Sequence, residues 1–291
     1  MPIEVRFWGV RGSIPSPGAA TAEIGGNTSC VEVRVGGRLL IFDGGTGLRM
    51  LGNSLLGQMP IEAWIFFSHV HWDHIQGFPF FTPAFVRGNV IHLYGGHKVS
   101  GTLEETLAGQ MENPSFPVHL SEMGAAMSFH DLFEGEVVKI PATDGTGGTI
   151  TISNARGNHP NGVYAYRVDY DGASVMYATD TEHYAVIDPR LRRLATGCDV
   201  LIYDSQYTPE EYAGINGMPK LGWGHSTYEE AIKLAKAANV DKLVLFHHDP
   251  TQDDKAVREK ERRARDLYEN CMAAYEGLVI PVIGKKTIVL P

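Results

Sequence analysis

Cysteine is scarce in this sequence. Its 291 residues include three cysteines, Cys30, Cys198 and Cys271, which are far apart and form no Cys-x-x-Cys pair. A set this sparse and odd in number excludes a disulfide framework and a cysteine-type zinc site. We expect all three to be small buried residues of a protein from a reducing compartment.

Long apolar runs are also missing. No stretch reaches the roughly 20 apolar residues that a membrane-spanning helix needs. The first residues, MPIEVRFWGV, contain no basic segment followed by an apolar core, so we expect no signal peptide. The sequence therefore predicts a cytoplasmic protein without a membrane partner.

Positive charge is in short supply. Lysine and arginine total 25 against 34 aspartates and glutamates, which gives a formal net charge of −9. A general affinity for the nucleic-acid backbone normally needs a basic surface. The charge balance therefore disfavours RNA or DNA as the main partner.

What remains is the composition of an ordinary globular protein, with 43% hydrophobic and 20% charged residues and no low-complexity segment. The order of elements, β-rich then helical then β-rich then helical, predicts one domain over residues 1–291. It would contain two sheets packed face to face with helices outside. Strands are predicted at 2–10, 30–35, 38–42, 63–68, 90–94, 127–129, 136–140, 149–154, 163–170, 174–178, 200–203, 242–246 and 278–290, and helices at 47–57, 100–111, 227–238 and 258–274.

The densest chemical signal is HVHWDH, residues 69–74. It places three histidines and one aspartate directly after an apolar run typical of a strand buried on both faces. Imidazole nitrogens and carboxylate oxygens are ligands for zinc and similar divalent metals. His69 and His71, two residues apart, can converge on one ion, and Asp73 and His74 can reach a second.

Further candidate ligands occur downstream, each near the end of a predicted strand. His159 and Asp180 each follow such a strand, and His247 and His248 form a pair after another. A lone histidine in a turn is usually a surface residue. Three such positions together with HxHxDH indicate a shared metal site at the strand ends.

HVHWDH matches the HxHxDH signature of the metallo-β-lactamase-fold hydrolases, and the sequence resembles that superfamily over essentially its whole length. His159, Asp180 and His247 match the remaining ligand positions in order, and Asp43 in IFDGGTG resembles the early Asp-x-Gly turn. The resemblance implies an α/β fold, a four-layer αββα sandwich with the metals at one edge. It also implies a dinuclear centre in which His69, His71 and His159 hold the first ion, Asp73, His74 and His247 hold the second, and Asp180 bridges them.

Some assignments in this centre stay open. The His-x-x-Pro pattern of the phosphodiesterase branch favours His247 as the last ligand, with His248 as the alternative. Asp249 is a candidate to orient a ligand histidine. Arg11 either faces a phosphate or supports its loop, and His183 either lines the pocket or lies on the surface. Zinc is the expected metal, and manganese or iron also suits a His/Asp set.

The segment GWGHST, residues 222–227, resembles the one that precedes the last ligand in ribonuclease Z and related zinc phosphodiesterases. In that branch its histidine sits over the scissile phosphate, so the resemblance implies a catalytic role for His225. Asp73 would orient the attacking hydroxide and take its proton, while His225 would stabilise the phosphate or protonate the leaving alkoxide. A structural alternative is that Ser226 or Thr227 caps a helix that starts here.

These features predict a metal-dependent hydrolase that cleaves small phosphodiesters, such as a cyclic nucleotide. The resemblance to this branch, and nothing else in the sequence, implies a homodimer. Ribonuclease Z-type RNA 3′-processing is the alternative. The acidic composition disfavours this alternative, and so does the absence of a basic tip in residues 95–127. That segment instead suits a pocket lid or a dimer contact. A lactone or thioester hydrolase is the second alternative. An iron oxidoreductase is disfavoured because His71 stands where flavodiiron-type relatives have Glu. A binding protein without enzymatic activity is disfavoured because no metal ligand of the family is missing.

Overall fold

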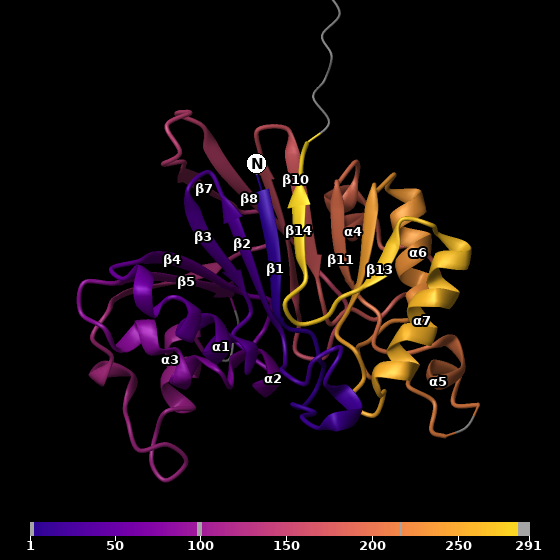
Figure 1. The fold of residues 1–291 in the computed structure, drawn as a ribbon, viewed down its shortest axis with the longest axis horizontal. Helices are drawn as coiled ribbons and strands as arrows, with labels where there is room; N and C mark the ends of the chain where they lie inside the picture. The colour runs from indigo at the N-terminus through magenta and orange to yellow at the C-terminus, as the bar shows by residue number, and fades with distance from the viewer. Residues whose placement is uncertain (1–2, 98–100, 216, 285–291) are drawn as a thin grey trace, which may run out of the picture.

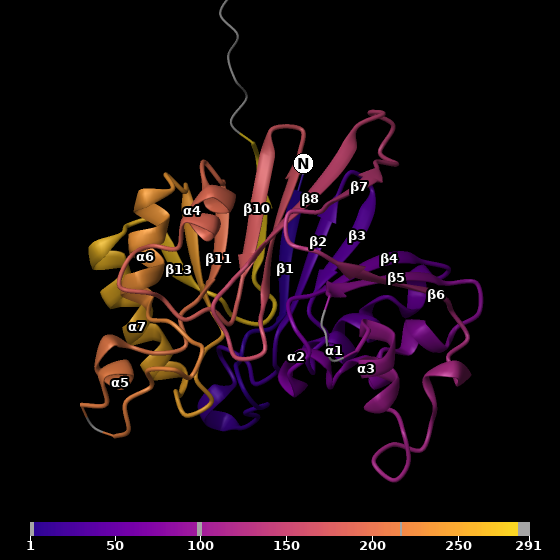
Figure 2. The same ribbon diagram turned by 180° about the vertical axis from the view of Figure 1, so that it is seen from behind.

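Two seven-stranded β-sheets packed face to face form the centre of the molecule (Figure 1). The computed structural model describes residues 3–97, 101–215 and 217–284. Helices cover the outer face of each sheet, as the view from behind also shows (Figure 2). The layers therefore run helix, sheet, sheet, helix, which is the αββα sandwich that the sequence predicted.

The first sheet has the strand order β14-β1-β2-β3-β4-β5-β6. Neighbours are antiparallel from β14 to β3 and parallel from β3 to β6. The β2–β3 hairpin turns at Gly36 and Gly37, whose positive φ angles of 54° and 78° suit a tight two-residue turn. The strands are β1 Ile3–Gly9, β2 Cys30–Val35, β3 Arg38–Phe42, β4 Glu62–Phe67, β5 Val90–Gly96, β6 Ala126–Leu132 and β14 Val279–Val282.

The second sheet has the strand order β13-β12-β11-β10-β9-β8-β7. Neighbours are antiparallel from β7 to β10 and parallel from β10 to β13. The strands are β7 Val137–Pro141, β8 Thr149–Arg156, β9 Tyr164–Tyr170, β10 Ala173–Ala178, β11 Val200–Asp204, β12 Lys242–Phe246 and β13 Cys271–Ala273.

Helices α1, α2 and α3 pack on the first sheet, and α4, α6 and α7 pack on the second. In the described part of the chain, every helix is too short or too polar to cross a lipid bilayer. The α-helices are α1 Gly47–Ser54, α2 Trp72–Ile75, α3 Leu103–Gly109, α4 Pro189–Ala195, α5 Pro209–Ala213, α6 Tyr228–Ala237 and α7 Asp254–Leu267, and the 3₁₀ helices are Ala19–Thr21, Leu56–Gln58, Phe78–Phe80, Thr82–Phe85 and Leu120–Glu122.

Apolar side chains fill three layers. One layer lies between the sheets, where Phe42 packs against Phe66, Tyr166 and Tyr177. The other two lie between each sheet and its helices. All three cysteines are buried and unpaired, as predicted. The alternating and continuous apolar runs of the sequence therefore point into a common sandwich.

The last predicted helix was wrong in its extent. The sequence indicated a helix over 258–274, but α7 begins at Asp254, capped by the side chain of Asp253, and ends at Leu267. Cys271–Ala273 is instead the edge strand β13, paired in parallel with β12. The short helices α2, α4 and α5 were not predicted. Residues 285–290 of the predicted final strand, and residue 100 of a predicted helix, lie outside the described residues.

Candidate metal centre

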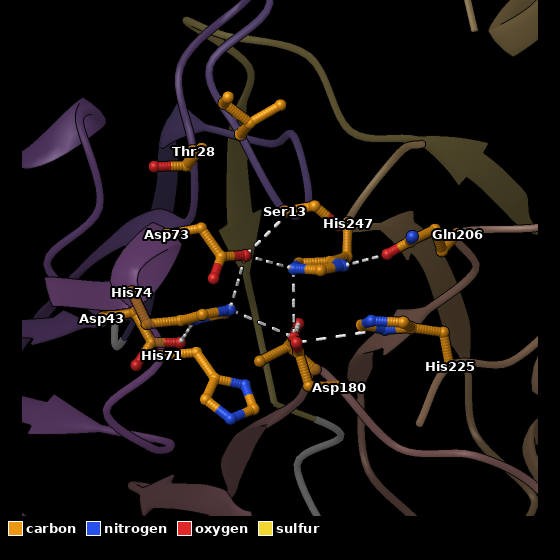
Figure 3. Close-up of polar contacts among 12 residues, drawn as sticks. Ser13, Thr28, Asp43, His71, Asp73, His74, Asp180, Gln206, His225 and His247 are labelled. Carbon is orange, nitrogen blue, oxygen red and sulfur yellow. Dashed lines mark hydrogen bonds and ion pairs between the residues drawn. The ribbon is translucent and has the colours of Figure 1, made fainter. Parts of the chain in front are cut away.

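Polar loops meet at one edge of the sandwich, where β4, β10, β11 and β12 end. Helix α2 follows β4 directly and carries part of HVHWDH. His159 joins from the turn between β8 and β9. Figure 3 shows side chains from these separate loops pointing toward one another. Carboxyl ends of parallel strands are a common place for ligand sites in α/β folds.

Three imidazoles form the first cluster. Nε2 of His69 lies 2.9 Å from Nδ1 of His71, and Nε2 of His159 lies 3.0 Å from the same atom. Burial lowers the pKa of all three rings, most strongly that of His69. Neutral rings keep a lone pair for a metal ion, so the first cluster is a set of three converging nitrogen donors.

Two carboxylates and two imidazoles form the second cluster. Nε2 of His74 lies 3.2 Å from Oδ2 of Asp73 and 3.3 Å from Oδ1 of Asp180. Nε2 of His247 lies 3.2 Å and 3.1 Å from the same two oxygens. Burial alone would raise the pKa of both carboxyls, but the adjacent imidazoles outweigh it and hold both pKa values well below the usual range. The two carboxylates are therefore ionised.

Asp180 faces both clusters at once. Its Oδ1 points to the second cluster, and its Oδ2 lies 3.7 Å from Nε2 of His69 and 3.8 Å from Nε2 of His159. Its φ of 51° is in the left-handed region, which residues other than glycine seldom adopt. Such strain is held by the surrounding structure and concentrates at functional sites.

This donor set fits a pair of divalent cations. The first cluster offers three nitrogens, and the second offers two nitrogens and two oxygens, with the ligand atoms of each group within 4.8 Å of one another. Nε2 of His74 is buried and makes no hydrogen bond with any described residue, although it lies within 3.3 Å of carboxylate oxygens of Asp73 and Asp180. A buried polar atom without a partner is costly unless something else binds it. Histidine nitrogen and aspartate oxygen are the usual protein ligands of zinc-like ions.

Asp43 orients part of the centre from behind. It is fully buried, and its Oδ2 accepts hydrogen bonds from Nδ1 of His74 at 2.8 Å, Oγ of Ser68 at 2.7 Å and Oη of Tyr177 at 2.7 Å. The hydroxyl of Ser68 also lies 3.0 Å from Nδ1 of His69. Asp43 therefore directs Nε2 of one histidine into the second cluster and supports one histidine of the first.

Two more outer contacts orient ring nitrogens in the same way. Nδ1 of His247 lies 2.8 Å from Oε1 of Gln206, and Nδ1 of His159 lies 2.8 Å from the carbonyl oxygen of Gly224. Both partners are acceptors, so each Nδ1 donates its proton and each Nε2 keeps a lone pair. Metal-ligating histidines are commonly oriented in this manner.

The two neighbours at the end of β12 point in different directions. His247 enters the second cluster, whereas Nε2 of His248 bonds the carbonyl oxygen of Ala274 at 3.0 Å. The φ of His247 is 60°, in the left-handed region. Asp249 does not contact a histidine, because its carboxylate accepts hydrogen bonds from Thr251. The expected orienting role of Asp249 was wrong.

His225 stands beside both clusters. Its Nδ1 lies 2.9 Å from Oδ2 of Asp204, and its ring stacks on His247 with centroids 5.0 Å apart. Burial lowers the pKa of His225, but the charge and hydrogen bond of Asp204 outweigh it and raise the pKa to about 9. Thr227 caps α6, as the structural alternative expected. His225 therefore lies beside the clusters and also just before the start of a helix, so the two interpretations of this segment are compatible.

Sequence reasoning missed Asp204, Gln206 and Lys260. Lys260 is buried, and its Nζ donates to the carbonyl oxygen of Ser205 and to Oε1 of Gln252, each at 2.7 Å. Burial lowers its pKa to about 7. Lys260 thus stabilises the turn after β11, which carries Asp204 and Gln206, the hydrogen-bond partners of His225 and His247. A signal existed only for Asp204, which ends an apolar strand much as Asp180 follows one.

Arg11 and His183 lie outside the two clusters. Arg11 is fully buried and donates to the carbonyl oxygens of Gly25 and Gln252, so it supports its loop and does not face a phosphate. His183 is partly buried, with Nδ1 3.1 Å from Oγ of Ser226, and lines a neighbouring hollow.

A cavity of about 510 Å³ opens over the centre. Its walls include ligand-type side chains from both clusters, His225, and the indoles of Trp72 and Trp223. A second cavity of about 850 Å³ also reaches His69 and His71, with residues 95–97 and 101–103 in its wall. The segment 95–127 therefore contributes to a pocket next to the site.

Comparison with known proteins agrees with this geometry. The family model of the β-lactamase superfamily domain matches residues 38–248. A ribonuclease Z from Thermococcus sibiricus is 26% identical over 287 residues, covering 85% of this chain and 87% of its own. A ribonuclease Z from Bacillus subtilis is 25% identical over 259 residues, covering 75% and 80%.

Solved structures share the fold at low sequence identity. The metallo-β-lactamase-fold protein YhfI from Bacillus subtilis superposes with a TM-score of 0.66 at 20% identity, over 96% of this chain and 98% of that one. The short form of human tRNase Z gives 0.63 at 19% identity, over 96% and 99%. A diphosphatase of the PhnP family gives 0.67 at 17% identity, over 96% and 97%. The chain therefore belongs to the metallo-β-lactamase-fold superfamily of metal-dependent hydrolases.

Proposed function

We propose that this chain is a dinuclear metal-dependent phosphodiesterase that cleaves small phosphodiesters, a cyclic nucleotide or a related compound. The observation that carries the proposal is the pair of His225 and Asp204, in which the carboxylate holds the imidazole on the wall of the cavity that both clusters line. An imidazole N–H oriented in this way can donate to the charged oxygens of a phosphate group. A lactone or thioester carbonyl is neutral before attack, so His225 would interact with it less strongly than with a phosphate.

The residues of the two clusters would hold the ions. Bound there, two divalent cations supply Lewis acidity that activates water and neutralises phosphate charge. The first ion would be held by His69, His71 and His159, the second by Asp73, His74 and His247, and Asp180 would bridge them.

The chain's own residues would move the protons. Among the described residues, Asp73 makes its hydrogen bonds and ion pairs through Oδ2, which accepts the N–H of Ser13 at 2.8 Å. Its Oδ1 is therefore available to orient the attacking water and accept its proton. Nδ1 of His225 is committed to Asp204, so its Nε2–H is left to donate to the phosphate or to the leaving oxygen.

RNA 3′-processing is the alternative, because relatives from Thermococcus sibiricus and Bacillus subtilis are ribonuclease Z proteins. The net charge of −9 weighs against it, since phosphate-backbone binding depends on lysine and arginine. Lactone or thioester hydrolysis by the same metals is the second alternative.

The test is a hydrolysis assay on zinc-loaded protein with bis(p-nitrophenyl) phosphate, a lactone and a thioester side by side. We expect phosphodiester turnover that falls by about 10²–10⁴-fold in Asp73→Asn. Asp249→Asn is the matched control, because among the described residues this carboxylate accepts hydrogen bonds only from Thr251, and it should retain activity. Cleavage of the lactone or thioester alone would contradict the proposal, and so would full activity in Asp73→Asn.

Zinc as the resident ion, a homodimer and a cytoplasmic location complete the proposal. They are supported by the His/Asp donor set, by resemblance to the phosphodiesterase branch and by the acidic, cysteine-poor composition. Elemental analysis and light scattering of the purified protein test the first two, and fractionation of cells tests the third.

A further inference from the structure

Two tryptophans stand on the rim of the cavity over the candidate metal centre. Trp72 lies between His71 and Asp73 and is 82% exposed. Trp223 lies two residues before His225 and is 48% exposed. Both indoles line the cavity of about 510 Å³. The most exposed large hydrophobic side chain of the described residues is therefore inside the ligand motif itself.

The other two tryptophans are engaged elsewhere. Nε1 of Trp8 donates to Glu32 at 2.7 Å, and Trp64 stacks on His92 with centroids 4.9 Å apart. The indole of Trp72 has no hydrogen bond or ring contact with any described residue. Its aromatic face is thus open to a molecule that enters the cavity.

Both indoles are held by backbone that the site fixes. The carboxylate of Glu182 accepts the N–H of Gly222 at 2.7 Å and of Gly224 at 2.9 Å, which pins the chain on both sides of Trp223. Nζ of Lys220 lies 4.0 Å from the centre of the Trp223 ring. Trp72 is the first residue of α2, flanked by candidate ligands. A tryptophan side chain has only two rotatable χ angles, so an exposed indole on fixed backbone binds a partner with little loss of conformational entropy.

We propose that Trp72 and Trp223 form an aromatic recognition site for the organic part of the substrate, which is a planar heteroaromatic group such as a nucleobase. The inference rests on the proposed function, which assigns a phosphodiester as substrate, and adds the kind of organic group that is attached to the phosphate. Every nucleobase has a π-face that stacks on aromatic side chains, with a gain of about 5- to 150-fold in affinity per base. Alkyl and glycerol phosphodiesters have no such face.

The test is equilibrium binding to zinc-loaded protein, which needs no turnover. The probes are adenosine 5′-monophosphate and methyl phosphate, and the measured quantity is the ratio of their dissociation constants. We expect adenosine monophosphate to bind at least about fivefold more tightly, and the ratio to fall at least about threefold in Trp72→Ala and Trp223→Ala. Taking a ratio cancels any effect of a substitution on metal loading or phosphate binding.

Two further variants sharpen the result. Trp223→Phe keeps an aromatic face and should restore most of the preference. Phe80→Ala is the matched control, because Phe80 is 54% exposed but packs edge-on against Phe116, outside the wall of either cavity. Equal affinities for the two probes, or a ratio that the tryptophan variants leave unchanged, would overturn the inference.

Hydrolysis separates this inference from the proposed function. Bis(p-nitrophenyl) phosphate and methyl p-nitrophenyl phosphate share a leaving group and differ only in the group that is retained. The ratio of their kcat/KM values should fall in the tryptophan variants and not in Phe80→Ala. Preference for adenosine monophosphate without any phosphodiester turnover would reject the function and keep the aromatic site. Phosphodiester turnover without a preference for adenosine monophosphate would keep the function and reject the aromatic site.

Discussion

Asp43→Asn is the substitution that tests the architecture of the centre most directly. Asp43 is fully buried and touches no candidate ion position itself, yet it accepts four hydrogen bonds. Asparagine has the same shape but replaces one acceptor oxygen by an NH₂ group. That group must face either the backbone N–H of Ser68 or the three donors around Oδ2, which include Nδ1 of His74. At least one buried donor then loses its acceptor.

The expected size of the effect follows from those contacts. A buried donor without a partner costs about 1–3 kcal/mol of stability. In either orientation of the amide, the carboxylate charge behind a ligand histidine is lost, which lowers the basicity of its ring and weakens metal binding by about 10- to 100-fold. Because Asp43 orients His74 directly and reaches His69 only through Ser68, the second ion should be lost first.

Competition with a coloured chelator measures both binding constants. We expect one zinc ion to bind Asp43→Asn nearly as in the unaltered protein and the other to bind about 10- to 100-fold more weakly. Tyr177→Phe is the control. It removes one of the four hydrogen bonds without touching a histidine, so it should lower stability by about 1 kcal/mol and leave both constants within about twofold. Unchanged affinity for both ions in Asp43→Asn would refute the reasoning.

Three further predictions follow from the surroundings of the clusters. In the metal-free protein, Asp204→Asn should lower the pKa of His225 from about 9 toward 6.5, as NMR would show, and should remove stability that is fully present below pH 6.5 and lost as pH rises through about 9. Lys260 has a pKa of about 7 in the fold against an ordinary 10.5, so the unfolded chain binds more protons between these values and unfolding free energy rises with pH. Lys260→Met should remove that rise in urea denaturation between pH 7 and 9. Gly224→Ala would place Cβ 2.1 Å from Nδ1 of His159 and should lower the number of zinc ions bound per chain. Gly222→Ala is the control, because Gly222 has a similar positive φ but no atom within 4 Å of the added Cβ, and it should leave that number unchanged.

Much of the fold could be predicted because its signals are local. The strands Cys30–Val35, Arg38–Phe42 and Lys242–Phe246 have the predicted ends, since β-branched and apolar residues there are bounded by glycine turns or polar residues. The end of α7 was mistaken because its charged amphipathic pattern continues in the sequence. Pairing with β12 turns Cys271–Ala273 into a strand, and that neighbour is distant in the chain.

The sequence by itself determined the chemistry available to this protein: HVHWDH, His159, Asp180 and a histidine pair, all at strand ends. Only the tertiary structure decided which of His247 and His248 enters the cluster, because Nε2 of His247 faces Asp180 whereas Nε2 of His248 bonds the carbonyl oxygen of Ala274. It also decided that Asp204 serves His225, across 21 residues of sequence. Ligand types are written in the chain, but the contacts that orient them join residues that come together only when the two sheets pack.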